Sequence, residues 1–283
     1  MLDAHLMNTV VAAALAEDAP AGDITSTLVI PADAHATAVL AAREPGILAG
    51  AEVFAAAFTL TDPSVHVELL RHDGEAFAAG DELARVNGPA RAVLTGERVA
   101  LNFAQRMSGI ATLTRQYVDA IAGTNAVILD TRKTTPTLRA FERHAVVCGG
   151  GTNHRFSLSD AFMAKDNHLA VLTGGGLDLT AALQRVKSQL PHGMVFEVEV
   201  DRIDQIEPVL AGGVDVIMLD NFSLDDLRAG VAQIAGRAKI EASGGVNLTT
   251  VAAIAATGVD YVSVGALTHS ARALDLGLDV RIS

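Results

Sequence analysis

Six short apolar runs, separated by segments with helical periodicity, occupy residues 126–265 and constrain the fold more than any other feature of the chain. The runs lie at residues 126–130, 159–165, 194–200, 214–220, 239–242 and 261–265. The helical segments between the later runs lie at residues 178–190, 203–211, 223–235 and 249–257. Because parallel neighbours in a sheet need a long crossover between them, this alternation predicts a parallel sheet covered by helices. Six such units favour an α/β barrel over an open sheet.

Up to about residue 90 the pattern is mixed. Helical patterns at residues 4–16 and 51–58 alternate with strand patterns at residues 36–43 and 65–71, which predicts a small α+β unit. Apolar residues then recur at threes and fours over residues 91–122, as in a long helix. We expect Gly109 to break or kink that helix.

The last residues alternate strictly between apolar and polar side chains from Leu274 to Ile282. This period of two predicts a half-buried strand, which does not suit a barrel interior. We therefore expect residues 271–283 to return to the sheet of the N-terminal unit. The predicted domains are an N-terminal domain at residues 1–110, completed by this strand, and a barrel at residues 111–270.

The overall charge limits the classes of partner. The chain has 283 residues, a formal net charge of -12 and no tryptophan. An acidic protein with few aromatic residues lacks the broad basic field and the stacking surface that nucleic acids require, although a local basic pocket remains compatible with the composition. The single cysteine, Cys148, excludes a disulfide within the chain and suits a reducing compartment. We interpret Cys148 as a small buried helix residue.

No apolar run approaches the ~20 residues of a membrane span. The apolar residues 10–15 follow a segment without Lys or Arg, unlike a secretory signal. We expect a cytoplasmic protein without a membrane partner.

Positive charge gathers in residues 129–169, where three consecutive glycines also occur. The cationic and titratable residues of this segment are Arg132, Lys133, Arg139, Arg143, His144, His154, Arg155, Lys165 and His168. Guanidinium groups bind carboxylates and phosphates through two parallel hydrogen bonds, so the segment predicts a site for anionic small molecules. Alternatively, Arg132 and Arg155 form structural ion pairs with Asp130 or Asp160. We interpret Arg143 and His144 as helix-surface residues.

The predicted strands end in polar residues, and active sites of α/β barrels lie at the carboxyl ends of their strands. These polar ends are residues 130–133, residues 165–168, Glu197 with Glu199, Asp220, residues 241–245 and Gly265. Glu197 and Glu199 alternate along one strand, so both side chains face the same side. An unpaired carboxylate inside a barrel is costly, so both need a cationic partner or a metal.

Eight motifs occur in a fixed order along the chain. They are EDAPAGDITS at 17–26, GERVALNFAQRMSGIATLT at 96–114, DTRKTTPTLR at 130–139, GGGTNHRFSLSDAFMAKDNH at 149–168, EVEV at 197–200, IMLDN at 217–221, EASGG at 241–245 and DYVSVGALTHS at 260–270. Together they resemble the quinolinate phosphoribosyltransferase family nearly end to end. The resemblance implies an N-terminal α/β sandwich domain and the open seven-stranded α/β barrel of a type II phosphoribosyltransferase. It also implies homodimers, or larger assemblies such as hexamers, with each site completed by the neighbouring subunit.

The resemblance further implies a reaction, the carboxylating nicotinate-nucleotide pyrophosphorylase step of de novo NAD synthesis. Quinolinate and phosphoribosyl pyrophosphate react with Mg²⁺ to give nicotinate mononucleotide, pyrophosphate and CO₂. The residues that it assigns to quinolinate are Arg132, His154, Arg155 and Lys165, with Arg98 from the partner subunit. Those that it assigns to the ribose and pyrophosphate are Lys133, Glu199 and Asp220, and those near the 5′-phosphate are Ser243, Gly244, Gly245, Gly265 and His269. Arg139 and the segment Asp23-Ile24-Thr25 receive no role.

The chemistry of this reaction suits these residue types. Quinolinate carries two adjacent carboxylates, and opposite charges ~4 Å apart attract by ~4 kcal/mol at an effective dielectric constant near 20. Loss of pyrophosphate leaves oxocarbenium character on the sugar, which Glu199 and Asp220 can stabilise directly or by holding Mg²⁺, while Lys133 and Lys165 attract the leaving group. The ring nitrogen becomes positive and accepts the electrons of the departing carboxylate, so we expect no dedicated nucleophile.

The glycines suit a different part of the substrate. The segment 243–245 lies between a predicted strand and a predicted helix, where backbone N–H groups can face a phosphate.

Three alternatives remain at this stage. A paralogue associated with molybdenum transport shares a TRKT-like motif but departs from the family at residues 165–168, which are intact here as KDNH. A barrel aldolase would use Lys133 or Lys165 to form a Schiff base. A regulatory barrel would bind phosphorylated ligands without turnover.

Overall fold

The computed structural model describes residues 2–283 and divides the chain into two compact units. The first unit comprises the chain up to Arg115 together with Thr135–Gly150 and Ser270–Ser283. The second unit comprises Gln116–Thr134 and Gly151–His269. Residues 135–150 thus group with the N-terminal segments, whereas the sequence pattern had assigned them to the barrel. Contacts such as the ion pair between Arg106 and Glu142, at 2.8 Å, hold this segment to the long helix of the first unit.

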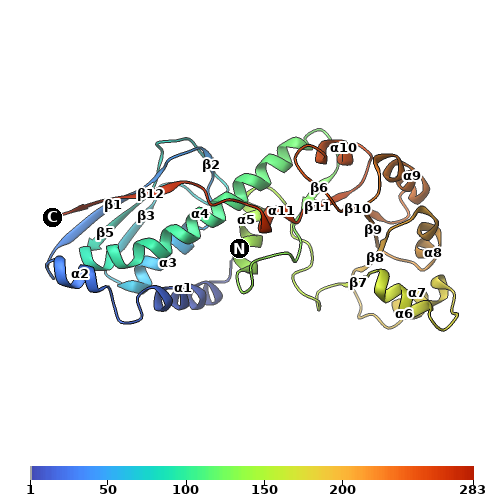
Figure 1. Ribbon diagram of the computed structural model, residues 1–283, viewed down its shortest axis with the longest axis horizontal. Helices are drawn as coiled ribbons and strands as arrows, with labels where there is room; N and C mark the ends of the chain where they lie inside the picture. The colour runs from blue at the N-terminus through green and yellow to red at the C-terminus, as the bar shows by residue number, and fades with distance from the viewer. Residues whose placement is uncertain (1) are drawn as a thin grey trace. The chain divides into compact units, whose positions relative to one another are not determined.

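The sheet of the first unit is antiparallel and has the strand order β12-β1-β5-β3. Its strands are β1 (His35–Ala42), β3 (His66–Leu69), β5 (Glu82–Pro89) and β12 (Leu276–Ile282). The alternating tail forms β12, which runs alongside β1 with Leu278 opposite Leu40 (Figure 1). Two short strands, β2 (Gly46–Ile47) and β4 (Ala76–Phe77), form a separate antiparallel pair.

The helices of the first unit are α1 (Ala4–Asp18), α2 (Ile24–Val29), α3 (Ala51–Thr61), α4 (Ala90–Ala120), whose last residues belong to the second unit, and α5 (Arg139–Cys148). The expectation that Gly109 interrupts α4 was wrong, because α4 is continuous through it. A Cβ at position 109 would lie 1.9 Å from the carbonyl oxygen of Arg272. Glycine is therefore required for the close approach of another segment and not for a bend.

Asp23 has a structural explanation that the sequence alone did not provide. It is the N-cap residue of α2, and its side chain accepts a hydrogen bond from the backbone N–H of Ser26 at 3.0 Å. The Ser26 hydroxyl donates to the same carboxylate. The Asp23-Ile24-Thr25 segment thus begins a helix.

The second unit contains a parallel sheet of six strands in the order β6-β11-β10-β9-β8-β7. The strands are β6 (Val127–Leu129), β7 (Phe162–Ala164), β8 (Phe196–Val200), β9 (Val216–Asp220), β10 (Lys239–Ser243) and β11 (Tyr261–Ser263). Beyond β6, Thr152 forms an isolated parallel bridge with Leu129. The seven strands implied by the resemblance are thus six strands and one bridged residue, with β6 and β7 at the two ends of the sheet.

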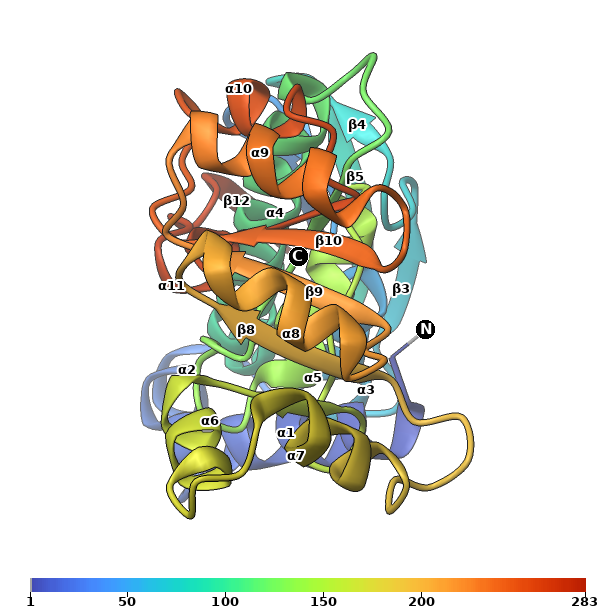
Figure 2. The same ribbon diagram turned by 90° about the vertical axis from the view of Figure 1, so that its right-hand side faces the viewer.

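Helices connect these strands, as the alternation predicted. They are α6 (Asp166–Thr173), α7 (Leu179–Lys187), α8 (Ile206–Ala211) after a short 3₁₀ turn (Ile203–Gln205), α9 (Leu224–Ile234), α10 (Val251–Ala255) and α11 (Ala266–His269). Figure 2 shows α8 and α9 across one face of β8, β9 and β10. The central strands are buried on both faces, with Val198, Ile217 and Leu219 fully inaccessible to solvent. Polar side chains are therefore confined mainly to the strand ends.

No helix among residues 2–283 is both long enough and apolar enough to span a membrane.

Candidate active site

A cavity of about 460 Å³ opens at the carboxyl ends of the parallel strands. Eight residues predicted for the site line it, namely Arg132, Lys133, His154, Arg155, Lys165, Glu199, Asp220 and Ser243. The others in its lining are Thr131, Met163, Met218, Glu241 and Ser263. These residues lie far apart in the sequence, and the strand ends bring them together because all six strands run in one direction.

Arg132 and Arg155 give the cavity its positive charge. Arg155 donates to the carbonyl oxygen of Ala161 at 3.1 Å, and burial together with the charge of Arg132 lowers its pKa. The Nε atom of Arg132 is buried and has no hydrogen-bond partner. Two neighbouring cations, one with an unsatisfied buried donor, form a receptor that an anion would complete.

His154 lies between two buried glutamates. Its Nε2 atom is 3.3 Å from a carboxylate oxygen of Glu197 and 3.3 Å from one of Glu241. Burial opposes the charged form of His154, but its hydrogen bonds with both carboxylates outweigh burial and raise its pKa to about 10. The sequence predicted a cationic partner or a metal for Glu197; the partner that the structure places beside it is this histidine.

The proton arrangement of this cluster follows from a backbone contact. The N–H of Arg155 donates to Nδ1 of His154 at 2.7 Å, which only a ring without a proton on Nδ1 can accept. This contact opposes the doubly protonated ring that a pKa of about 10 would give at neutral pH, because the backbone N–H occupies the Nδ1 lone pair. Burial raises the pKa of Glu197. His154 therefore carries its proton on Nε2, where it faces Glu197 and Glu241.

Two further buried groups hold this cluster in position. From the sequence, Asp130 was considered only as an ion-pair partner of Arg132 or Arg155, and no role was given to Ser263. The carboxylate of Asp130, at the end of β6, accepts a hydrogen bond from the backbone N–H of His154 at 2.7 Å. The hydroxyl of Ser263, on β11, donates to Glu241 at 2.5 Å.

Lys165 and Glu199 form an ion pair across the ends of β7 and β8. Glu199 is mostly buried, whereas 43% of the Lys165 side chain is exposed. The backbone N–H of Lys165 donates to Nδ1 of His168 at 2.9 Å, at the first turn of α6. The prediction that Glu199 needs a cationic partner is confirmed. Each group of this pair could instead contact a ligand of opposite charge.

Asp220 ends β9, and its carboxylate accepts a hydrogen bond from the side-chain amide of Asn221 at 2.6 Å. Asn221 has a positive φ of 58°, and a Cβ on Gly244 would lie 2.1 Å from its side-chain oxygen. Gly244 is therefore required by the approach of Asn221. The segment 243–245 was predicted to lie directly before a helix. In the structure, the next helix, α10 (Val251–Ala255), begins only at Val251.

Gly265 and His269 lie next to the cavity but do not line it. A Cβ on Gly265 would be 3.0 Å from Cδ of Lys133 and 3.2 Å from Nε2 of His269. The hydroxyl of Thr268 donates to the backbone carbonyl of Lys133 at 2.7 Å. The turn after β11 thus fixes the backbone that carries Lys133.

Arg98 does not line the cavity. It is exposed on α4, in the first unit. Its contribution to a neighbouring subunit stays a prediction.

Family models match almost the whole chain. Residues 23–108 match the model described as quinolinate phosphoribosyl transferase, N-terminal domain. Residues 110–279 match the corresponding C-terminal domain.

Individual relatives agree with this match. The chain is 41% identical over 267 residues to a probable nicotinate-nucleotide pyrophosphorylase [carboxylating] of Bacillus subtilis, covering 94% of this chain and 91% of that protein. It is 43% identical over 276 residues to the nicotinate-nucleotide pyrophosphorylase [carboxylating] of Mycobacterium leprae, covering 94% of each.

Two solved structures have the same fold throughout. NadC from Streptococcus pyogenes superposes with a TM-score of 0.94 at 41% identity, covering 100% of this chain and 98% of that one. The nicotinate-nucleotide pyrophosphorylase from Francisella tularensis has a TM-score of 0.92 at 36% identity, covering 99% and 98%.

Proposed function

The chain belongs to the quinolinate phosphoribosyltransferase family, and from this premise we propose how its residues perform the reaction of that family. The protein transfers the phosphoribosyl group of phosphoribosyl pyrophosphate to quinolinate, with release of pyrophosphate and CO₂, and forms nicotinate mononucleotide for NAD synthesis. It is a pentosyltransferase.

The observation that carries the assignment of residues is the pair of guanidinium groups of Arg132 and Arg155 in the strand-end cavity. Quinolinate presents two adjacent carboxylates, and each can accept two hydrogen bonds from one guanidinium fork. Binding of the dianion removes the repulsion between the two arginines and gives the buried Nε of Arg132 an acceptor. His154, held by Glu197 and Glu241, orients the ring.

Lys165 and Glu199 separate when the substrates bind. The ammonium group of Lys165 turns to a substrate carboxylate or phosphate, while Glu199 becomes free to accept hydrogen bonds from the ribose hydroxyls. Their ion pair holds both groups at the cavity where the substrates react. Lys133 attracts the leaving pyrophosphate, since its charge favours the products of bond cleavage.

Glu199 and Asp220 would hold the Mg²⁺ that accompanies phosphoribosyl pyrophosphate. Both carboxylates line the same cavity, and Mg²⁺ in phosphate sites uses one or two carboxylates together with phosphate oxygens and water. The donor set therefore fits this ion. When bound, Mg²⁺ neutralises charge that develops on the pyrophosphate.

The ribosylated ring needs orientation more than covalent help. Its nitrogen is positive once the bond to the sugar has formed, and it accepts the electron pair released as the adjacent carboxylate leaves. Arg132 and Arg155 keep the ring in place, and no side chain forms a bond to the sugar. A covalent enzyme–sugar adduct would contradict this mechanism.

The 5′-phosphate binds near Ser243, Gly244 and Gly245, with Gly265 and His269 at the neighbouring turn. Gly244 and Gly245 both have positive φ, which exposes their backbone N–H groups, and Ser243 lines the cavity. The position after the last strands agrees with the phosphate sites of many barrels.

The protein works as a homodimer, or as an assembly of dimers, in the cytoplasm. Arg98, exposed on α4, reaches the quinolinate site of the partner subunit. Mixed dimers of Arg98→Ala with Lys165→Ala chains should regain activity, because one site of each such dimer contains both wild-type residues. Mixed dimers without activity would refute the shared site.

The direct test measures pyrophosphate and CO₂ release with quinolinate and, separately, with nicotinate as the acceptor. We expect both products with quinolinate and neither with nicotinate. Activity with nicotinate alone, without CO₂, would refute the assignment. Borohydride trapping of a carbonyl substrate on Lys133 or Lys165 would instead support a Schiff-base aldolase, and binding of substrates without turnover would support a regulatory barrel.

A further inference from the structure

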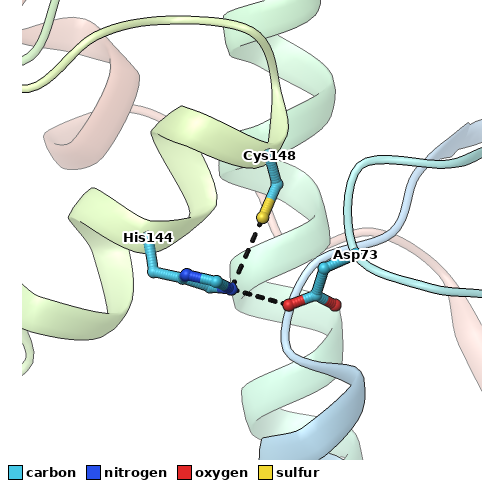
Figure 3. Close-up of side chains that lie close together, drawn as sticks. All are labelled: Asp73, His144 and Cys148. Atoms are coloured by element: carbon cyan, nitrogen blue, oxygen red, sulfur yellow. Dashed lines mark hydrogen bonds and ion pairs between the residues drawn. The ribbon is translucent and has the colours of Figure 1, made fainter. Parts of the chain in front are cut away.

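Three potential metal ligands converge in the first unit. His144 and Cys148 lie one turn apart on α5, and Asp73 lies in the turn between β3 and β4. Figure 3 shows the three side chains pointing toward one another. None of them lines the cavity described above. The reaction assigned to that cavity uses none of them.

The distances between the ligand atoms are those of a compact cation site. Sγ of Cys148 is 3.5 Å from Nε2 of His144, and Nε2 is 2.6 Å from an Oδ atom of Asp73. All three ligand atoms lie within 4.8 Å of one another. With ordinary zinc bond lengths, tetrahedral sulfur and nitrogen ligands are roughly 3.5 Å apart, and nitrogen and oxygen ligands roughly 3.3 Å. The Cys148–His144 distance already fits, and the His144–Asp73 contact must lengthen by about 0.7 Å.

The backbone fixes the orientation of two ligands before any ion binds. The second Oδ atom of Asp73 accepts a hydrogen bond from the N–H of Ala51 at 2.9 Å, at the start of α3, where the N-cap Gly50 offers no side chain. His144 and Cys148, four residues apart on one helix, share a face. Because these ligands are already oriented, less conformational entropy is lost when an ion binds.

The burial of the cluster suits an ion that arrives from solvent. The side chains of His144 and Asp73 are 21% and 22% exposed. Burial alone would raise the pKa of Asp73, but hydrogen bonds from His144 and from the backbone of Ala51 and Gly50 outweigh it and lower the pKa. Asp73 is therefore a carboxylate at neutral pH.

A catalytic cysteine is the main alternative, and the geometry opposes it. Burial and the charge of Asp73 raise the pKa of the Cys148 thiol to about 12, so the free thiol is a poor nucleophile. In a Cys–His–Asp triad the carboxylate holds the ring nitrogen that is not used by the cysteine. Here Sγ of Cys148 and the carboxylate of Asp73 both contact Nε2 of His144.

We propose that Asp73, His144 and Cys148 form a binding site for a divalent cation of the zinc type, with water as the fourth ligand. Sulfur and imidazole ligands select zinc or cobalt over Mg²⁺. On binding, the thiol of Cys148 releases its proton to solvent and a metal–sulfur bond forms. The ion ties the turn that carries Asp73 to the end of α5.

The test uses cobalt as a spectroscopic probe on the full chain after treatment with a chelator. One equivalent of Co²⁺ should produce the sulfur-to-cobalt charge-transfer band and the intense visible bands of a tetrahedral site, and Zn²⁺ should abolish both. Cys148→Ser should lose the charge-transfer band, and Asp73→Asn and His144→Gln should weaken Co²⁺ binding at least tenfold. His72→Gln, an exposed histidine beside Asp73, is the matched control and should bind Co²⁺ like the wild type.

Absence of the charge-transfer band in the wild type, or its persistence in Cys148→Ser, would refute the site. A second measurement does not depend on the variants being folded. Zn²⁺ should raise the thermal unfolding temperature of the chelator-treated wild type, and a chelator should reverse the rise. No rise at a Zn²⁺ concentration far above that of the protein would also refute the site.

Discussion

Two histidines, one in each unit of the molecule, contact carboxylates through Nε2, yet they are held in different ways. His154 lies between two fully buried glutamates, and its other ring nitrogen accepts a backbone N–H. His144 shares its Nε2 between one half-buried carboxylate and a thiol. In the barrel, the two glutamates lie within strands β8 and β10, whereas in the first unit the partners come from one helix and one turn.

The difference shows how burial decides the use of a histidine. A buried cluster whose imidazole and carboxylates are joined by hydrogen bonds can orient a substrate, because breaking those hydrogen bonds would leave further buried polar groups unsatisfied. The partly exposed cluster around His144 has no such restriction. Its shared Nε2 can exchange a hydrogen bond for a bond to an ion. Four changes would break or sharpen this comparison, and they follow from the largest expected effect to the smallest.

The largest effect should come from Arg132→Ala in the strand-end cavity. Removing one partner of a buried charge pair costs about 2–5 kcal/mol, so kcat/KM for quinolinate should fall by roughly 30- to 4,000-fold. Arg132→Lys should recover only part of this, because ammonium cannot bind a carboxylate through a planar fork. Steady-state kinetics with each substrate varied in turn would measure both changes.

The exposed Arg185, on α7, offers the matched control. Arg185→Ala should leave kcat/KM unchanged. Equal losses in the two alanine variants would mean that Arg132 acts through the overall charge and not by contact with quinolinate.

The second-largest effect compares how much the cluster around His154 and the cluster around His144 each stabilise the fold. Glu241→Ala removes one of the two carboxylates that His154 contacts and leaves the Ser263 hydroxyl without its buried acceptor, which costs about 1–3 kcal/mol of unfolding free energy. Asp73→Ala, in the partly exposed cluster around His144, should lower the unfolding free energy by about 1 kcal/mol, since water can replace the lost hydrogen bond. Urea unfolding of the two variants in the presence of a chelator would give both values, and a larger loss for Asp73→Ala would reverse the comparison.

Lowering the pH should change the stability contributed by Asp73 and by Glu197 in opposite directions. The pKa of Asp73 is lowered from 3.8, so the folded state binds its proton less tightly than the unfolded state does. Its contribution to stability is present above pH 3.8 and is lost as the pH falls through the lower folded value. The pKa of Glu197 is raised from 4.5, so its contribution is greatest below pH 4.5 and declines as the pH rises toward the higher folded value.

The variants Asp73→Asn and Glu197→Gln keep the side-chain shapes but cannot titrate. The unfolding free energy of the wild type minus that of Asp73→Asn should increase as the pH rises to 3.8. The corresponding difference for Glu197→Gln should decrease as the pH rises above 4.5. Slopes of the same sign would show that one of the two pKa shifts has been assigned in the wrong direction.

The sequence predicted the barrel and the residues around its cavity for one physical reason. Parallel strands place all their carboxyl ends at one edge, so Lys165, Glu199 and Asp220 had to lie near one another once the alternation was recognised. The partners of His154 could not be derived in this way, because their pairing depends on side-chain directions across three strands.

Contacts between distant segments could also not be predicted from the sequence. Gly109 was read as a helix breaker because nothing nearby in the chain reveals the carbonyl of Arg272 against it. Cys148 was read as an inert buried residue, since its distance from Asp73 is set by the packing of α5. Arg143 was read as a surface residue but is only 8% exposed.

The smallest effect should follow from Asp23→Ala in the first unit. Asp23 accepts hydrogen bonds from the backbone N–H and the hydroxyl of Ser26 at the start of α2, and loss of such a cap costs about 1 kcal/mol. Its pKa is lowered by these hydrogen bonds, so the cost should shrink in acid, as the carboxyl group becomes protonated. Asp23→Asn, which retains an acceptor, should lose much less stability than Asp23→Ala. If both variants instead lost kcat at unchanged stability, Asp23 would belong with the strand-end residues in function, and the motif that contains it would have more than a capping role.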